Sequence, residues 1–187
     1  MSKQKLLYYI ILCYFCFLPE NSFSQLLNID DIKFTYKDTK TFEEDVLLSA
    51  LGLNESDIYN PQILSENIYK LEKFYFDNGF FDAKIDTAVK YDYADEEVFI
   101  NVIVTENRHY KIDTLIYYGI GNLPENVQKL LFKNKKIKPG SFYSKTDIVL
   151  ETNETIDILQ NNGYMNARLK QDSSTIVKKS TMSNIWS

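Results

Sequence analysis

The stretch from Phe74 to Tyr91, FYFDNGFFDAKIDTAVKY, contains the end of a helix and the start of a strand within a few residues. Before Asn78 the apolar residues have helical spacing, whereas after Phe81 they alternate with polar residues. Gly79 lies between the two patterns, and a residue without a Cβ readily adopts the left-handed conformation that ends a helix. The sequence therefore predicts a helix, a glycine turn and a half-buried strand from Ala83 to Tyr91.

The same turn occurs again further along the chain, in the stretch from Asn161 to Leu169. Its glycine, Gly163, lies 84 residues after Gly79. Two strand-like stretches that end in aromatic residues, Asp31 to Tyr36 and Asp113 to Tyr118, lie 82 residues apart. Internal repetition of this length indicates two small modules in tandem.

Length and composition bound the possible classes of protein. A chain of 187 residues can hold two domains of about 80 residues each. Its hydrophobic share of 44% excludes global disorder, and its net charge of -5 excludes the basic footprint of a nucleic-acid-binding protein. We therefore expect a folded, two-domain chain that does not bind nucleic acid.

The start of the chain has the pattern of an export signal. Two lysines precede the apolar run Leu6 to Leu18, which is too short to span a bilayer comfortably, and a polar stretch follows it. We therefore predict a cleaved signal peptide over residues 1–24, and the alternative is an uncleaved membrane anchor. Cys13 and Cys16 both lie within this segment, so the mature chain would have neither disulfides nor thiol chemistry.

The first module, residues 25–107, is predicted to contain a strand, two helices and two strands. The expected elements are a strand Ile29 to Tyr36, a helix after Thr41 that ends at Gly52, a helix that begins at Asn60-Pro61, and strands Ala83 to Tyr91 and Val98 to Thr105. Thr41 and Glu44 have the spacing of a capping box, and Asn60 before a proline is a typical helix start. Apolar residues on both faces of Val98 to Thr105 predict the central strand of the sheet.

The second module, residues 108–177, is predicted to begin in the same order but to remain incomplete. The expected elements are a strand Tyr110 to Tyr118, a helix from Pro124-Glu125, a helix from Ser144 to Asn162-Gly163 with Ile148, Thr152, Ile156 and Leu159 inward, and a strand from Ala167. No counterpart of Val98 to Thr105 follows, and residues 178–187 read as an unstructured tail.

The element order, the exported start and the two Gly-aromatic-x-x-Ala turns, at Gly79 and Gly163, resemble tandem polypeptide-transport-associated (POTRA) domains. Such domains belong to BamA-like outer-membrane protein assembly factors of the surface antigen type, and the resemblance covers Ile29 to about Val177. It implies an α+β fold of two β-α-α-β-β modules, each a three-stranded mixed sheet covered by two helices. It also implies a non-enzymatic periplasmic role at the outer membrane. The chain lacks the membrane barrel of that family and reads as a fragment.

The resemblance implies a binding site at a free sheet edge, where unfolded outer-membrane proteins or assembly partners add an extended strand. In this family the second strand is the usual free edge. Here it corresponds to Lys84, Ile85, Asp86, Thr87, Ala88, Val89 and Lys90. Charged residues on this strand would also oppose aggregation. Phe76 and Phe81 have no obvious inward place, which leaves open whether they are ordinary partly exposed residues or a contact patch beside the edge.

The sequence predicts no catalytic, cofactor or metal site. As a metal ligand, the only histidine, His109, would need a second ligand, and as a general base it would need a nucleophile. The mature chain offers neither another histidine nor a cysteine. Gly119-Ile120-Gly121 lacks the third glycine and the Lys-Ser/Thr of a phosphate loop. The acidic residues between Asp92 and Glu97 lack the spacing of a calcium loop and read as a hairpin turn. The rivals to polypeptide binding are a membrane-tethered scaffold and an enzyme that uses the Gly119 turn.

Overall fold

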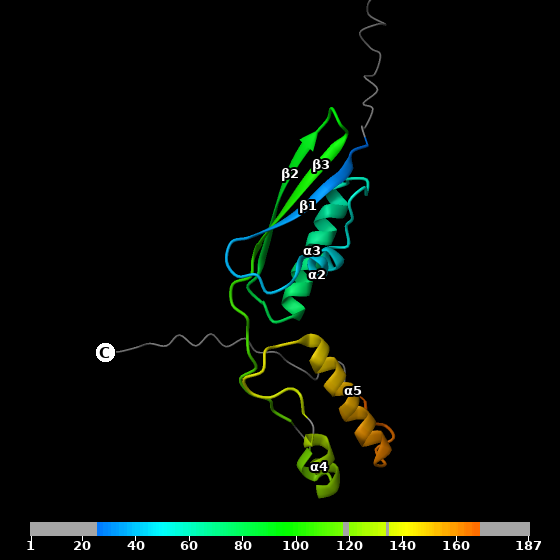
Figure 1. Ribbon diagram of the computed structural model, residues 1–187. Coiled ribbons are helices and arrows are strands. Elements are labelled where there is room, and N and C mark those ends of the chain that lie inside the picture. Colours follow the sequence, from blue (N-terminus) through cyan, green and yellow to red (C-terminus); the bar gives the residue numbers. More distant parts are fainter. Residues whose placement is uncertain (1–25, 118–119, 134, 169–187) are drawn as a thin grey trace, which may run out of the picture.

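The computed structural model describes residues 26–117, 120–133 and 135–168. The predicted signal peptide and tail lie outside these residues. The elements are β1 (Asn28–Tyr36), α2 (Glu44–Leu51), α3 (Pro61–Asp77), β2 (Lys84–Asp92), β3 (Glu97–Thr105), the 3-10 turn η1 (Ile120–Asn122), α4 (Glu125–Phe132) and α5 (Lys145–Asn161). Figure 1 shows α2 and α3 on one face of the sheet, with α4 and α5 beyond its lower end.

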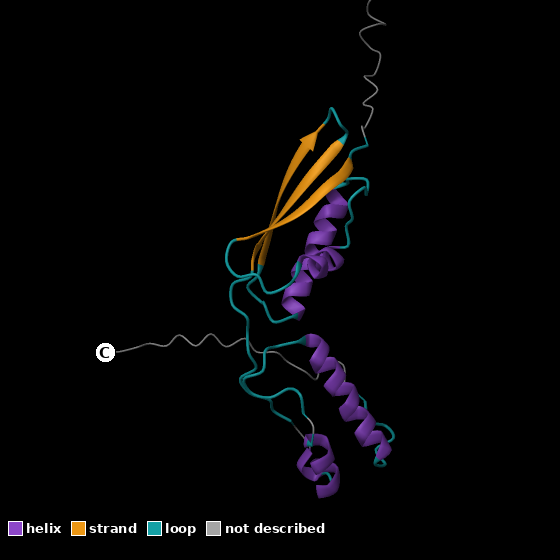
Figure 2. Ribbon diagram, in the orientation of Figure 1, coloured by secondary structure: helices purple, strands orange, loops and turns teal. Residues whose placement is uncertain are grey.

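The sheet has the strand order β1-β3-β2. β1 runs parallel to β3, and β2 runs antiparallel to it, from Lys84 opposite Thr105 to Asp92 opposite Glu97. Four alternate residues of β3 are almost completely buried, namely Val98, Ile100, Val102 and Val104. The α+β class, the mixed three-stranded sheet and the central place of this strand are therefore confirmed, and Figure 2 shows the three strands as one layer.

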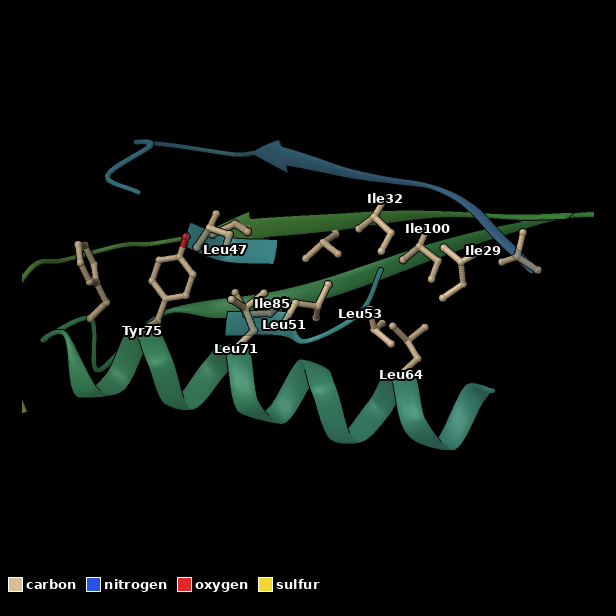
Figure 3. Close-up of a cluster of buried hydrophobic side chains, with 14 of the residues drawn as sticks. Ile29, Ile32, Leu47, Leu51, Leu53, Leu64, Leu71, Tyr75, Ile85 and Ile100 are labelled. Atoms are coloured by element: carbon tan, nitrogen blue, oxygen red, sulfur yellow. The ribbon is translucent and has the colours of Figure 1, made fainter. Parts of the chain in front are cut away.

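The core lies between the sheet and α3. Leu64, Leu71 and Tyr75 project from α3 toward the sheet, as Figure 3 shows, and each is buried. Burying a side chain of this size stabilises the fold by about 1.5–3 kcal/mol. The helix begins at Asn60, whose side-chain Oδ1 accepts the N–H of Gln62 at 2.8 Å. The predicted helix start is thus present.

The predicted capping box at Thr41 and Glu44 is wrong. α2 begins at Glu44 without a side-chain cap, and Thr41 instead donates its N–H and its hydroxyl to the buried carboxylate of Glu106, at 2.9 and 2.7 Å. Thr39 and Tyr75 donate hydroxyl hydrogen bonds to the same carboxylate, at 3.0 and 3.3 Å. Hydrogen bonds to a charged acceptor are stronger than the neutral cap would be. This cluster fastens the loop before α2 to the end of β3.

The predicted strand Tyr110 to Tyr118 is not formed over its described part. Residues 110–117 make one isolated bridge, between Lys111 and Phe142, and Tyr118 lies outside the described residues. A strand needs a neighbour for its backbone groups, and within the described ranges no counterpart of β3 runs beside this segment. Of the last predicted strand, Ala167 and Arg168 are irregular, and the rest lies outside the description.

The helices of the second half form where predicted. Ser144 Oγ accepts the N–H of Asp147 at 3.2 Å at the start of α5, which ends at Asn161 with Asn162 as its C-cap before Gly163. The residues predicted to face inward are only half-buried: Ile148, Thr152, Ile156 and Leu159. Without a covering sheet among the described residues, α5 buries only Glu151.

Backbone hydrogen bonds repeat between the two halves. Two hydrogen bonds in the first half have counterparts in the second half, between residues that lie 83 or 84 positions later in the chain. The N–H of Ile29 donates to Asp57 as that of Ile112 donates to Ser141 (2.8 Å each), and the N–H of Tyr59 donates to Leu27 (2.8 Å) as that of Tyr143 donates to Tyr110 (3.0 Å). The bridges between Asn28 and Ile58 and between Lys111 and Phe142 match in the same way. The division into two modules stays a prediction, and this repetition favours it.

Candidate functional site

β2 is an edge strand with one open side. All nine of its residues pair with β3, and within the described ranges no strand lies along its other side. In an antiparallel pair, successive residues direct their N–H and C=O groups to opposite sides of the strand. The outer side of β2 therefore presents a row of backbone donors and acceptors that a further strand can pair with.

The opposite edge, β1, is less continuous. A bulge interrupts its register between Ile29 and Asp31. The loop before α3 covers its start, because Ile29 both donates to Asp57 at 2.8 Å and accepts from the N–H of Ser56 at 2.6 Å. Of the two edges, β2 is the longer uninterrupted one.

The side chains of β2 leave this edge accessible. Ile85 is buried at 8% exposure and Val89 is half-buried, so both face the core. The remaining predicted site residues are exposed: Lys84, Asp86, Thr87, Ala88 and Lys90. Two of them have partners on the open face of the sheet, where Asp86 pairs with Lys37 at 3.6 Å and Lys90 lies 5.3 Å from the ring centroid of Phe99. Exposed pairs of this kind contribute little to stability.

The turn before β2 belongs to a junction between the two halves. Gly79 has a positive φ of 86°, and a Cβ built there would lie 2.8 Å from the backbone carbonyl oxygen of Tyr143. Its own carbonyl oxygen accepts the N–H of Tyr110 at 2.9 Å. Gly163 has the same kind of turn, with φ 97°, but a Cβ there would meet nothing within 4 Å.

Aromatic rings fill this junction. His109 lies stacked between Phe80, at 4.2 Å, and Phe142, at 3.9 Å between ring centroids. Burial lowers the pKa of His109, so the neutral ring is favoured in this sandwich. Phe81 contacts the rings of Tyr110 and Tyr143 at 5.2 and 4.9 Å. The chain's one histidine is therefore a packing residue between the two halves.

An ion pair crosses the same junction. Lys145 lies 3.2 Å from the carboxylate of Asp77, which also pairs with Lys73 at 2.7 Å. Burial alone would raise the pKa of Asp77, but the two lysines outweigh it and hold the pKa below its ordinary value. Sequence reasoning missed this junction, because its partners lie 68 positions apart and carry no shared motif.

The two aromatic residues without an assigned place have different environments. Phe81 is half-buried in the junction, whereas Phe76 packs on it at 4.8 Å and remains 49% exposed.

The acidic stretch after β2 is a turn, in which Asp92 accepts the N–H of Ala94 at 3.1 Å. Of the glycine turn, Gly119 lies outside the described residues, and Ile120–Asn122 forms η1.

Among the residues that the structure describes, no group of three or more His, Cys, Asp or Glu side chains is placed to hold a metal ion. Across the same residues, no helix has the length and apolar character needed to cross a membrane.

Comparison with known families identifies the first half. Residues 28–107 match the family described as POTRA, surface antigen variable number repeat. These residues form a POTRA domain. The match spans β1 to β3, including the open edge and the glycine turn, so the resemblance to POTRA domains is confirmed for the first half of the chain.

The chain's similarity to a known protein extends over more residues than the POTRA match does. The outer membrane protein assembly factor BamA of Buchnera aphidicola subsp. Acyrthosiphon pisum (strain APS) is 27% identical over 154 residues, which cover 76% of this chain and 24% of BamA. The chain thus spans about a quarter of the length of that relative.

Solved POTRA structures are also similar. Haemophilus influenzae BamA POTRA3-5 matches at 16% identity, covering 74% of this chain and 51% of that one, with a TM-score of 0.44. POTRA1-2 of the periplasmic domain of Omp85 from Anabaena matches at 16% identity, covering 74% of this chain and 81% of that one, with a TM-score of 0.41. The assignment rests on the family match.

Proposed function

We propose that this POTRA domain acts in the periplasm, at the outer membrane, as a docking module of a protein assembly or translocation machinery. It binds extended polypeptide, either unfolded outer-membrane proteins or assembly partners, by strand addition along Lys84 to Lys90. The observation that carries the proposal is the open side of β2, whose nine residues are all paired on the other side with β3.

Energetics indicate that this binding is weak and tolerant of sequence. Roughly half of the residues of a strand direct their backbone groups to the open side, and each hydrogen bond gains about 0.5–1.5 kcal/mol net. Ordering a client residue costs about 1–2 kcal/mol in backbone entropy, so the two contributions nearly cancel. Net affinity must then come from apolar contacts beside the edge, where Val89 and the 40% exposed Tyr91 lie on the core side of β2.

Site-specific photocrosslinking tests the location of binding. We place a photoreactive residue at Ala88 on β2 and, as a matched control, at Thr35 on β1, since both side chains are exposed strand positions. An unfolded outer-membrane protein should crosslink at position 88 far more than at position 35. Equal crosslinking at the two positions, or a preference for position 35, would refute binding at the β2 edge.

Proline substitution tests the mode of binding. Neighbouring residues of β2 direct their N–H groups to opposite sides, so one of Asp86→Pro and Thr87→Pro removes a donor from the open side and the other breaks the ladder to β3. Circular dichroism and thermal unfolding identify the variant that keeps its fold. That variant should lose client crosslinking at position 88. If it folds and still captures client at the wild-type level, the client does not bind by strand addition.

We also propose that residues 108–168 belong to a second module of the same type. Its support is the repeated set of backbone hydrogen bonds and the two long helices, α3 and α5, which each have 17 residues.

A further inference from the structure

The junction between the two halves joins two complementary surfaces. One surface is the glycine turn after α3, made by Gly79, Phe80 and Phe81. The other is the near end of the second half, where Tyr110 donates its N–H to Gly79 and Tyr143 places its carbonyl oxygen against the open side of that glycine. His109 completes this surface by stacking on Phe80.

Both surfaces occur a second time, and within the described residues neither has a partner like the one in the internal junction. The glycine turn recurs after α5, where Gly163 is followed by Tyr164 and Met165, which are 37% and 77% exposed. The space that Tyr143 fills at Gly79 is open at Gly163, since a Cβ there would meet no atom of the described residues within 4 Å. An apolar groove of about 550 Å³ runs along this turn.

The second surface recurs at the start of the first half. The shared offset of 83 or 84 residues matches Leu26 to His109, Leu27 to Tyr110 and Tyr59 to Tyr143. Leu26 is 63% exposed, where its equivalent His109 is stacked between two rings. Figure 1 shows the start of β1 and the end of α5 at opposite ends of the molecule, so these two surfaces cannot meet within one chain.

We propose that copies of this chain associate head to tail, with the Gly163 turn of one copy docked on the Leu26 end of the next. The contact repeats the internal junction: the N–H of Leu27 takes the place of that of Tyr110 and donates to the carbonyl oxygen of Gly163. Tyr164 then packs on Leu26, and Met165 packs on Tyr59. Such a contact uses different surfaces on the two partners, so it builds open chains or rings. It does not depend on client binding at β2.

The contact between copies lacks the charged part of the internal junction. In the internal junction Asp77 pairs with Lys145. At the equivalent positions of the contact between copies, Asn161 replaces Asp77 and Pro61 replaces Lys145, so no ion pair can form there. We therefore expect an apolar association that is weaker than the internal junction and responds little to salt.

Cysteine crosslinking between two variants tests this proposal. Cys13 and Cys16 are first replaced by serine, and the full chain carrying Leu26→Cys is then mixed with the full chain carrying Tyr164→Cys. The control mixture pairs Leu26→Cys with Tyr69→Cys, which lies on α3 and is 67% exposed. The proposal predicts that the first mixture forms heterodimers several times faster than the control. Equal rates indicate random collision and overturn it.

Sedimentation of the full chain gives a second readout. The average mass should rise with protein concentration, and Met165→Asp, which places a charge in the apolar contact, should return it to that of the monomer. Tyr69→Asp should leave the self-association unchanged. A mass that stays monomeric at all concentrations, or association that survives Met165→Asp, contradicts the proposal. Because Met165 is remote from β2, client crosslinking at position 88 should survive this change, which separates the two proposals.

Discussion

Alanine at Gly79 is expected to destabilise the protein more than alanine at Gly163. Both glycines have positive φ, of 86° and 97°, so alanine at either position costs about 1–2 kcal/mol in backbone strain. At Gly163 the new methyl group meets no atom of the described residues within 4 Å. At Gly79 it would lie 2.8 Å from the carbonyl oxygen of Tyr143 and 3.3 Å from Cδ2 of His109, so the junction must open.

Opening the junction also costs free energy, because it breaks a hydrogen bond and a ring contact. The hydrogen bond from the N–H of Tyr110 to the carbonyl of Gly79 contributes about 0.5–1.5 kcal/mol. The stacking of His109 on Phe80 contributes a similar amount, about 0.5–1.5 kcal/mol beyond burial. We therefore expect Gly79→Ala to lower the free energy of unfolding by about 1–3 kcal/mol more than Gly163→Ala.

Urea denaturation of the two variants measures this difference, and amide hydrogen exchange locates it. The N–H of Tyr110 should lose its protection in Gly79→Ala and keep it in Gly163→Ala, since only the first change displaces its acceptor. Equal losses of stability, together with unchanged protection of Tyr110, would refute the reasoning.

Three further changes test the buried polar groups and a helix start. Glu106→Ala removes the acceptor of four hydrogen bonds, including two from Thr41, and should cost about 3–5 kcal/mol by thermal unfolding, whereas Glu106→Gln keeps one oxygen and should cost less. Burial raises the pKa of Glu151, but backbone N–H groups and Lys135 outweigh it and hold the pKa below its ordinary 4.5. Its stabilisation is therefore present above about pH 4.5 and is lost as the pH falls through the lowered pKa, and Glu151→Gln should remove this part of the acid dependence of unfolding. Asn60→Ala removes the cap of α3 and should cost about 1 kcal/mol in urea, while Asn60→Asp should be nearly neutral.

The sequence predicted the first half well because its signals are local. The alternation along β2, the apolar residues on both faces of β3, the Asn60 cap and the glycine at Gly79 are signals that each depend on residues within one element or one turn. The capping box at Thr41 failed because a stronger acceptor, Glu106, lies 65 residues away. A motif predicted from spacing alone takes no account of an acceptor that is distant in the sequence.

In the second half, the prediction of a strand at residues 110–117 was wrong for a related reason. Its alternation is as regular as that of β1, but alternation predicts only which face of a strand is buried. The strand itself requires a neighbour, and for β1 that neighbour is β3. Helices α4 and α5 form because their backbone hydrogen bonds are internal to each element.

The junction and the open edge are mechanically linked through a few residues. Phe81 contacts Tyr110 and Tyr143, and Asp82 accepts the hydroxyl of Tyr110 at 2.5 Å, so both are held by the second half. β2 begins two residues later, at Lys84. A rotation of the second half must therefore displace the first residues of the edge or break these contacts. If strand addition at β2 is the binding mode, the junction sets the direction in which a bound segment leaves the domain, and a change that opens the junction, such as Gly79→Ala, is expected to alter that direction.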